Sequence, residues 1–148
     1  MKKKIFRIID ANFNRSREAL RVCEEITRLA LDSRPLTREL KGMRNAVSRI
    51  VQDFAYEFEG STHARDAKRD VGRASRIPGG MDRRSVRDVF TANMERAKES
   101  LRVLEEFFKL IDPATSMKFS RLRFRAYDAE KKTLQKLEPH RHRRQGSA

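Results

Sequence analysis

Apolar residues recur at spacings of three and four along most of the chain, which is the period of an amphipathic helix. A first helix is expected from Asp10, as N-cap, to about Leu31. Its apolar positions are Ala19, Val22, Cys23, Ile26, Leu29 and Ala30. Ser33-Arg34-Pro35 offers a cap and an early-helix proline for a second helix, which is expected to run to about Phe58 and to end at Gly60.

The stretch from Gly60 to Arg84 has no sustained apolar stripe, so it predicts a long loop. Ser85 and Asp88 have the spacing of a capping box and open a third helix, which is expected to continue up to Pro113. A fourth helix is then expected on the apolar positions Met117, Leu122, Phe124, Tyr127 and Leu134.

An internal repeat is the most informative feature of the chain. Asn12 falls on Asn93 at an offset of 81 residues. The same offset aligns Arg15 with Arg96, Glu18 with Glu99, Leu20-Arg21-Val22 with Leu101-Arg102-Val103, Glu24-Glu25 with Glu105-Glu106, and Met43-Arg44 with Phe124-Arg125. We therefore expect an all-α fold, a four-helix assembly of two duplicated helical hairpins with approximate twofold symmetry and a long central loop.

Length and composition limit the organisation of the chain. Its 148 residues, 38% of them hydrophobic, indicate one helical domain over residues 1–138, with repeat halves at about 8–59 and 85–137. Residues 139–148 lack an apolar period and are expected to form a disordered basic tail. One cysteine and no long apolar run exclude a disulfide scaffold and a membrane span, so a cytoplasmic protein is expected.

The formal net charge of +14 calls for an anionic partner. Net charge alone does not choose among nucleic acid, acidic membrane and phosphorylated small molecules. A basic helical nucleic-acid-binding module is therefore one hypothesis, and an enzyme acting on a small phosphate compound is another. Inward polar repeats and few aromatic stacking platforms favour the enzyme, with any nucleic-acid binding non-specific.

The repeated polar residues are the candidate substrate-binding and catalytic groups. At about 100° per residue Asn12 lies in the middle of the apolar arc and Arg15 at its edge, and Asn93 and Arg96 do the same in the third helix. Such side chains are expected to point inward and to need partners, because burying them unpaired costs several kcal/mol. Both pairs are predicted to converge on one cavity, where Arg15 and Arg96 grip phosphate and the asparagines read a ring edge.

A structural interpretation of the same residues stays open. Each asparagine would cap a neighbouring helix, and the arginines would pair with Glu18 and Glu99. Arg44 and Arg125, matched by the same offset, complete the substrate-binding candidates. Cys23 aligns with Leu104, so it is expected to pack in the core and not to act as a nucleophile.

The segment from His63 to Arg73 interleaves carboxylates with basic residues around Gly72. This composition suits metal-bound phosphates, because carboxylate oxygens are ligands for Mg²⁺ and cations neutralise phosphate. Arg65 is the predicted phosphate clamp, Asp66 a catalytic group, and Asp66 and Asp70 the predicted metal ligands. The loop from His63 to Gly80 is expected to close over its ligands as a lid. Phosphate-binding P-loops, zinc-site spacings and serine nucleophile elbows are absent from the sequence.

Four groups of motifs carry a family resemblance over about residues 5–135. They are Arg7-Ile8-Ile9-Asp10-Ala11-Asn12-Phe13-Asn14-Arg15, Glu18-Ala19-Leu20-Arg21-Val22, Ala64-Arg65-Asp66 with Asp70-Val71-Gly72, and Ala92-Asn93 with Glu99 to Glu106. They resemble the helical domain often fused in front of thiamin phosphate synthase, an alternative type of hydroxymethylpyrimidine phosphate kinase.

The resemblance implies ATP- and Mg²⁺-dependent phosphorylation of hydroxymethylpyrimidine phosphate to its diphosphate. A separate thiamin phosphate synthase would then use this product, because no synthase domain follows. Ala67 and Arg73 stand where the family commonly has threonine, so a non-catalytic binder of thiamin-pathway phosphates is a third hypothesis. The sequence leaves the oligomeric state open, a homo-oligomer included.

Overall fold

The structure is a computed structural model that describes residues 1–56, 69–72 and 82–138. Four long α-helices, one of them extended by a π-helix, account for most of these residues: α1 (Lys2–Glu25) with η1 (Ile26–Ala30), α2 (Arg34–Asp53), α4 (Val86–Phe108) and α5 (Pro113–Leu137). The described ranges contain no strand, so the all-α fold class is confirmed.

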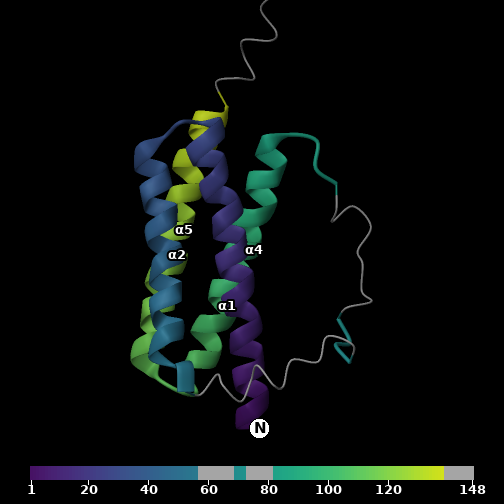
Figure 1. Ribbon diagram of the computed structural model, residues 1–148, viewed down its shortest axis with the longest axis vertical. Coiled ribbons are helices and arrows are strands. Elements are labelled where there is room, and N and C mark those ends of the chain that lie inside the picture. Colours follow the sequence, from purple (N-terminus) through teal and green to yellow (C-terminus); the bar gives the residue numbers. More distant parts are fainter. Residues whose placement is uncertain (57–68, 73–81, 139–148) are drawn as a thin grey trace, which may run out of the picture.

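The helices form two hairpins that pack together into one bundle (Figure 1). α1 and α2 make the first hairpin, and α4 and α5 make the second. The most extensive contact lies between α1 and α4, which run antiparallel, and a smaller one joins α2 to α5. A shared aromatic cluster connects the hairpins, because the Phe13 ring lies 6.0 Å from Phe108 and 5.8 Å from Phe119. No helix in the described ranges is long and apolar enough to cross a membrane.

Two of the predicted helix boundaries in the first half of the chain are wrong. α1 begins at Lys2, so Asp10 lies within the helix and does not cap it. The helix starts earlier because Phe6 and Ile9, both buried, continue its apolar face towards the N-terminus. α2 ends at Asp53, short of the predicted Phe58, and Gly60 lies outside the described residues.

The capping box of the third predicted helix is confirmed. The Asp88 N–H donates to Ser85 Oγ at 3.1 Å, and the Arg84 N–H donates to Asp88 Oδ2 at 3.0 Å. Pro113 has a different place from the predicted one, since α4 already ends at Phe108 and Pro113 begins α5. Most of the predicted loop from 60 to 84, and the tail from 139 to 148, lie outside the described residues.

The internal repeat has two registers and not one. α1 matches α4 at the predicted offset of 81, with buried residues facing buried residues: Ile9 and Phe90, Phe13 and Met94, Leu20 and Leu101, Cys23 and Leu104, Glu24 and Glu105. α2 matches α5 at an offset of 79: Leu36 and Thr115, Leu40 and Phe119, Met43 and Leu122, Val47 and Ala126, Ile50 and Ala129. The N-caps Ser33 and Asp112 keep this offset. The predicted pairing of Met43-Arg44 with Phe124-Arg125 is therefore wrong, because the second hairpin reaches its second helix two residues sooner.

The predicted apolar face of α5 is also largely wrong. Met117, Phe124 and Tyr127 are exposed, at 55%, 63% and 47%, whereas Leu122 is buried as expected. The buried face instead follows Thr115, Phe119, Leu122, Ala126, Ala129 and Thr133. Four of these six residues are alanine or threonine, and the spacing of large apolar residues does not reveal a contact made by such small side chains.

Candidate functional site

The two repeated asparagines make the same contact in both halves. Asn12 is buried and Asn93 is half-buried, and each Nδ2 donates at 2.8 Å to the carbonyl oxygen of the residue four positions earlier, Ile8 or Val89. Neither asparagine therefore caps a neighbouring helix, and that interpretation is wrong. Each Oδ1 lacks a hydrogen-bond donor among the described residues. The helix thus fixes both carboxamides and leaves both acceptor oxygens for another group.

The side chains of the two repeated arginines reach solvent and do not point into the bundle as expected. Arg15 and Arg96 are exposed, so the prediction that their guanidinium groups point inward is wrong. Both lie at the edge of the apolar arc, where a long side chain reaches solvent. Within the described part of the chain neither pairs with the glutamate three residues on, Glu18 or Glu99. Two guanidinium groups are therefore available for an anion.

The register of α1 against α4 places the two arginines at nearly the same level. The Cys23 thiol lies 3.8 Å from the carbonyl oxygen of Phe90. α1 and α4 run antiparallel, so a step back along α1 corresponds to a step forward along α4. Arg15 lies eight residues before Cys23 and is therefore level with the residue eight after Phe90, which is Lys98, two residues beyond Arg96. The axial offset between Arg15 and Arg96 is therefore about 3 Å, and that between the asparagines is about 12 Å.

The approximate twofold axis between α1 and α4 keeps matching residues on one side of the helix pair. Asn12 with Arg15, and Asn93 with Arg96, therefore share one face of α1 and α4, on which the two arginines lie between the two asparagines along the helix axis. This arrangement supports a common site. The convergence of all four side chains on one cavity stays a prediction, because the segment between α2 and α4 falls mostly outside the described residues.

The predicted metal-binding loop is described only over residues 69–72. Arg65 and Asp66 lie outside the described residues. Asp70 is exposed, and its Oδ1 accepts a hydrogen bond from the Gly72 N–H at 2.9 Å, which closes a local turn. No group of three metal-ligating side chains gathers in the portions that the structure describes. The Mg²⁺ site on Asp66 and Asp70, and closure of the lid, stay predictions.

Repeated charges outside this face have a structural partner. Arg44 Nε donates to Glu24 Oε2 at 2.8 Å, and Arg123 Nε donates to Glu105 Oε2 at 2.9 Å. Glu24 and Glu105 are buried, so each hairpin closes with the same ion pair between its two helices, which we call the hairpin clasp. Sequence reasoning missed Arg123, because an offset of 81 pointed to the wrong arginine.

Arg125 makes a contact of another kind. Its Nε donates to Glu39 Oε1 at 2.9 Å, which joins α5 to α2 across the two hairpins. Arg44 and Arg125 are both explained by these contacts without a ligand. Their assignment to substrate binding stays a prediction that the geometry does not favour.

Cys23 is confirmed as a core residue. It is fully buried, as is its repeat partner Leu104. Burial, with a smaller contribution from the Glu130 carboxylate, raises the pKa of the Cys23 thiol to about 12. A thiol with this pKa stays protonated at neutral pH, so it is not an activated nucleophile.

Lys98 is a buried charge that sequence reasoning missed. Its Nζ bonds to Glu95 and, at 3.0 Å, to Glu130 Oε1, and it lies 4.7 Å from the centre of the Tyr127 ring. Burial alone would lower the pKa of Lys98, but these hydrogen bonds raise it above its usual value. The first hairpin has Arg17, which is exposed, at the matching position, so this cluster breaks the symmetry.

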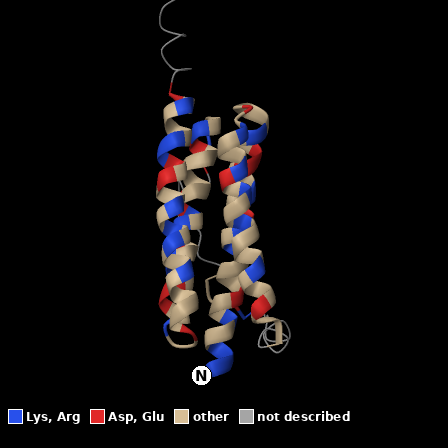
Figure 2. Cartoon of the chain, turned by 90° about the vertical axis from the view of Figure 1, so that its left-hand side faces the viewer, with Lys and Arg blue, Asp and Glu red and all other residues tan. Residues whose placement is uncertain are grey.

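The charged residues are spread over the bundle. Figure 2 shows Lys and Arg interleaved with Asp and Glu along the helices, without one basic stripe on the face in view. Several of these cations have carboxylate partners one turn away, such as Arg102 with Glu106 at 3.1 Å. Such pairs indicate a solvated helix surface.

Comparison with known proteins places these features in a family. The ThiD2 family model matches residues 7–132. Similar curated proteins include the thiamine-phosphate synthases of Synechocystis sp., 43% identical over 126 residues, and of Synechococcus sp., 39% identical over 127 residues. These alignments cover 85% and 86% of this chain but only 35% and 34% of the relatives.

A third relative is similar over nearly the whole chain. It is the thiamine-phosphate synthase of Thermosynechococcus vestitus, 37% identical over 146 residues, which are 98% of this chain and 40% of the relative. The chain thus spans between a third and two fifths of the length of these curated relatives. No solved structure matches the chain.

Proposed function

The chain belongs to the ThiD2 family, and on that basis we propose that it is a kinase of thiamine biosynthesis. In this proposal it transfers the γ-phosphoryl group of ATP to hydroxymethylpyrimidine phosphate and forms the diphosphate. The relatives are named thiamine-phosphate synthase, and the region they share with this chain is about a third of their length. A module of that size leaves room for an activity distinct from the one in their name.

One observation carries the proposal from the structure. By the register of α1 against α4 and the repeat that relates them, two symmetry-related pairs, Asn12 with Arg15 and Asn93 with Arg96, share one face of these helices. Each pair combines a fixed carboxamide acceptor with a guanidinium that has no ion pair or hydrogen bond to another described residue. An acceptor suits the amino group of an aminopyrimidine, and a guanidinium binds phosphate with two parallel hydrogen bonds. Two such pairs match a reaction with two phosphorylated reactants.

The chemistry requires few protein groups. The acceptor atom is a phosphate oxygen that is already anionic, so the transfer depends on positioning and on neutralisation of charge. Arg15 and Arg96 would orient the two phosphate chains on this face and offset their repulsion. With an acceptor that is already anionic and two arginines to hold the phosphates, the reaction needs no catalytic histidine or serine on this face.

The metal would bind in the loop that follows α2. Asp70 is exposed and engages only Oδ1 in its turn, so its carboxylate is open to a hard cation, and Asp66 is the second predicted ligand. These two carboxylates would hold Mg²⁺, which would supply positive charge to neutralise the phosphates. Arg65 would hold a phosphate from the same loop.

The test is a direct assay of the purified chain with Mg-ATP and hydroxymethylpyrimidine phosphate, following both ADP and the diphosphate product. We expect turnover that requires a divalent cation. Arg15→Ala and Arg96→Ala should each lower kcat/KM by about 100-fold, because each removes a charge-stabilising donor. Arg17→Ala, which removes an exposed guanidinium from the same helix, is the matched control and should leave kcat/KM unchanged.

The outcomes separate the three hypotheses. Absence of diphosphate with every divalent metal would reject the kinase. Saturable binding of the pyrimidine phosphate without turnover would identify a non-catalytic binder. Tight duplex-DNA binding that persists at 0.2 M salt would support the nucleic-acid module, since binding to the backbone alone weakens steeply with salt at about that concentration.

A further inference from the structure

The connection between α1 and α2 differs from its counterpart between α4 and α5. From Glu24 to Leu36 the chain has two residues more than in the matching stretch from Glu105 to Thr115. This stretch contains the π-helix η1, and Asp32 within it has a positive φ of 49°. π-Helical turns and such backbone angles are uncommon and persist where the surrounding structure holds them. The first hairpin therefore has a local structure here that the duplicated fold does not require.

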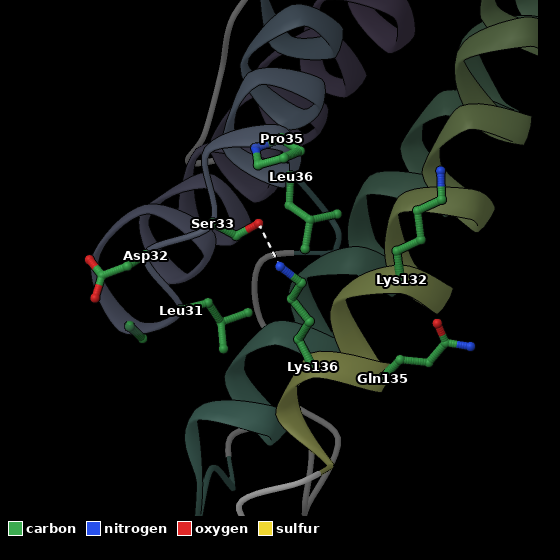
Figure 3. A pocket seen from close by; sticks show the side chains of 9 residues that line it. Leu31, Asp32, Ser33, Pro35, Leu36, Lys132, Gln135 and Lys136 are labelled. Atoms are coloured by element: carbon green, nitrogen blue, oxygen red, sulfur yellow. Dashed lines mark hydrogen bonds between the residues drawn. The ribbon is translucent and has the colours of Figure 1, made fainter.

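Two adjoining cavities open at this connection and share Asp32 and Ser33. The larger, of about 760 Å³, lies between the connection and the C-terminal turns of α5. Figure 3 shows Lys136 reaching from α5 to Ser33, with Leu31 and Leu36 lining the space between them. The smaller, of about 450 Å³, lies between the end of η1 and the first turns of α2.

Four basic side chains line the smaller cavity: Arg28, Arg34, Arg38 and Lys41. None of these side chains has an ion pair or a hydrogen bond with another described residue. Asp32 is the one carboxylate among the described residues that line the two cavities. Four unpaired cations around one concave surface repel one another and raise the local concentration of anions.

The second hairpin provides an internal comparison. At the offset of 79, Arg34, Arg38 and Lys41 correspond to Pro113, Met117 and Ser120, none of which is charged. The hairpin fold is therefore built without cations at these positions. The cluster of the first hairpin must have another reason than the packing of the bundle.

The cavity is separate from the face of α1 and α4 that carries the proposed kinase residues. Arg28 lies 13 residues beyond Arg15 along the same helical rod, which at the rise of a helix is about 20 Å. The Glu24–Arg44 contact places the middle of α2 beside the C-terminal end of α1, so the first turns of α2 lie farther still from Arg15. One small ligand does not reach both places.

We propose that this cavity binds the polyphosphate group of a small molecule, as found in nucleoside triphosphates or in inorganic tripolyphosphate. Arg34, Arg38 and Lys41 follow one helix face at spacings of four and three, over about 10 Å. A single phosphate is too short to contact the whole row, whereas two or three linked phosphates span it. Arginine adds two parallel hydrogen bonds to each phosphate that it contacts.

The experiment measures binding of inorganic tripolyphosphate by calorimetry at fixed ionic strength. The host is the full chain with Arg15→Ala and Arg96→Ala, so that the proposed kinase face contributes little. The test variant adds Arg38→Met and Lys41→Ser, the residues that α5 has at the matching positions. The control adds Arg121→Met and Lys118→Ser, which remove the same charge from the exposed surface of α5.

We expect the test variant to weaken tripolyphosphate binding at least tenfold with an unchanged melting temperature, and the control variant to bind as the host does. Orthophosphate should bind much more weakly than tripolyphosphate to the host. Equal losses in test and control would show diffuse attraction to the net charge and overturn the proposal. It would also be overturned if tripolyphosphate did not bind, or if duplex DNA bound more tightly than tripolyphosphate with the same dependence on Arg38 and Lys41. Because the host lacks both kinase-face arginines, a failure here is independent of the kinase assay.

ATP added at the same site distinguishes the two sources of the polyphosphate group. If the site takes a nucleotide, ATP should bind more tightly than tripolyphosphate, since the apolar Leu31 and Leu36 side chains of the larger cavity lie next to the cations. If the two ligands bind equally, the site reads phosphate alone. Either result supports the polyphosphate site, and loss of both in the control variant would contradict it.

Discussion

The two hairpins share one plan, and the places where they depart from it separate packing from other roles. Both have the same clasp, Glu24 with Arg44 and Glu105 with Arg123, at 2.8 and 2.9 Å. Both also tie an asparagine to its own helix at 2.8 Å. A contact that recurs through a duplication, between buried groups, is explained by the hairpin itself. An acceptor oxygen or a guanidinium that recurs without a partner is not.

The departures differ between the hairpins in chemistry. The first has cations beside the α1–α2 connection that lack partners among the described residues, and the second has the pair of buried Lys98 with half-buried Glu130. α5 also exposes Met117, Phe124 and Tyr127, where α2 has Arg38, Asn45 and Ser48 at the matching positions. The two hairpins have kept the positions of most buried residues, while many of the side chains at matching positions have diverged. The four predictions that follow test how far the likeness and the divergence extend.

The largest expected effect comes from breaking the clasp in either half. Glu24→Ala or Glu105→Ala leaves a half-buried guanidinium without its carboxylate, so each should lower the free energy of unfolding by about 3–5 kcal/mol. Urea unfolding of the two variants measures this. Glu106→Ala, which removes an exposed glutamate next to the clasp, is the control and should change stability little. Loss of stability in one half alone would show that the clasps are not equivalent.

Lys98→Met tests the asymmetric pair in the second hairpin. Removing the ammonium leaves the half-buried Glu130 carboxylate without its counter-charge, so stability should fall by about 3 kcal/mol. Arg17→Met at the matching position of the first hairpin should change it by less than about 0.5 kcal/mol. The pKa of Lys98 is raised above its usual 10.5, so its contribution is present at neutral pH and is lost as the pH rises through the raised value. Thermal melts of both variants at pH 7, and at a pH above the raised pKa of Lys98, measure the difference, and equal losses at the two positions would contradict the asymmetry.

Asn12→Ala and Asn93→Ala compare the two halves of the proposed site. Each variant removes one neutral hydrogen-bond acceptor that would contact the substrate, so kcat/KM of the kinase reaction should fall by about tenfold. Steady-state kinetics with each substrate varied in turn measures this effect. If the halves hold different substrates, the two variants should raise the KM of different reactants. Unchanged kinetics in both variants would leave the asparagines with a structural role only.

The smallest effect is expected for the pair that joins the hairpins at their surface. Glu39 and Arg125 are about two fifths exposed, at 39% and 42%, so Arg125→Ala should lower the free energy of unfolding by about 0.2–1 kcal/mol. The loss should shrink further in 1 M salt, because exposed charges are screened. Chemical unfolding at two salt concentrations measures it. A loss as large as that of the clasp variants would mean that Arg125 does more than pair at the surface.

Much of the fold could be predicted from particular residues. The apolar periods of α1, α2 and α4, the Ser85 cap and the repeat of α1 in α4 predicted four helices in two hairpins. The core role of Cys23 followed from its alignment with Leu104. The start of α1 did not follow, because Phe6 and Ile9 are too few to show a period and become buried only against other helices.

The sequence predicted which residues belong to the candidate site, but it did not predict the directions of all their side chains. The repeat selected Asn12, Arg15, Asn93 and Arg96, but helical angles alone placed the arginines inward. An arginine at the edge of an apolar arc can turn either way, since its long stem packs on the helix while its head reaches solvent. Arg125 was chosen over Arg123 because one offset was applied to helices that follow two.

The sequence by itself determined the fold class, the duplication and the polar residues that repeat, because these depend on periodicity and identity along one chain. Only the tertiary structure decided that the second helices match at 79 and not at 81, and that the buried face of α5 follows Ala126 and Ala129. It alone also decided that cations from η1 and α2 gather at one cavity. The reason is physical: a helix's own sequence sets its period, whereas its rotation and its partners are set by the surfaces that pack against it.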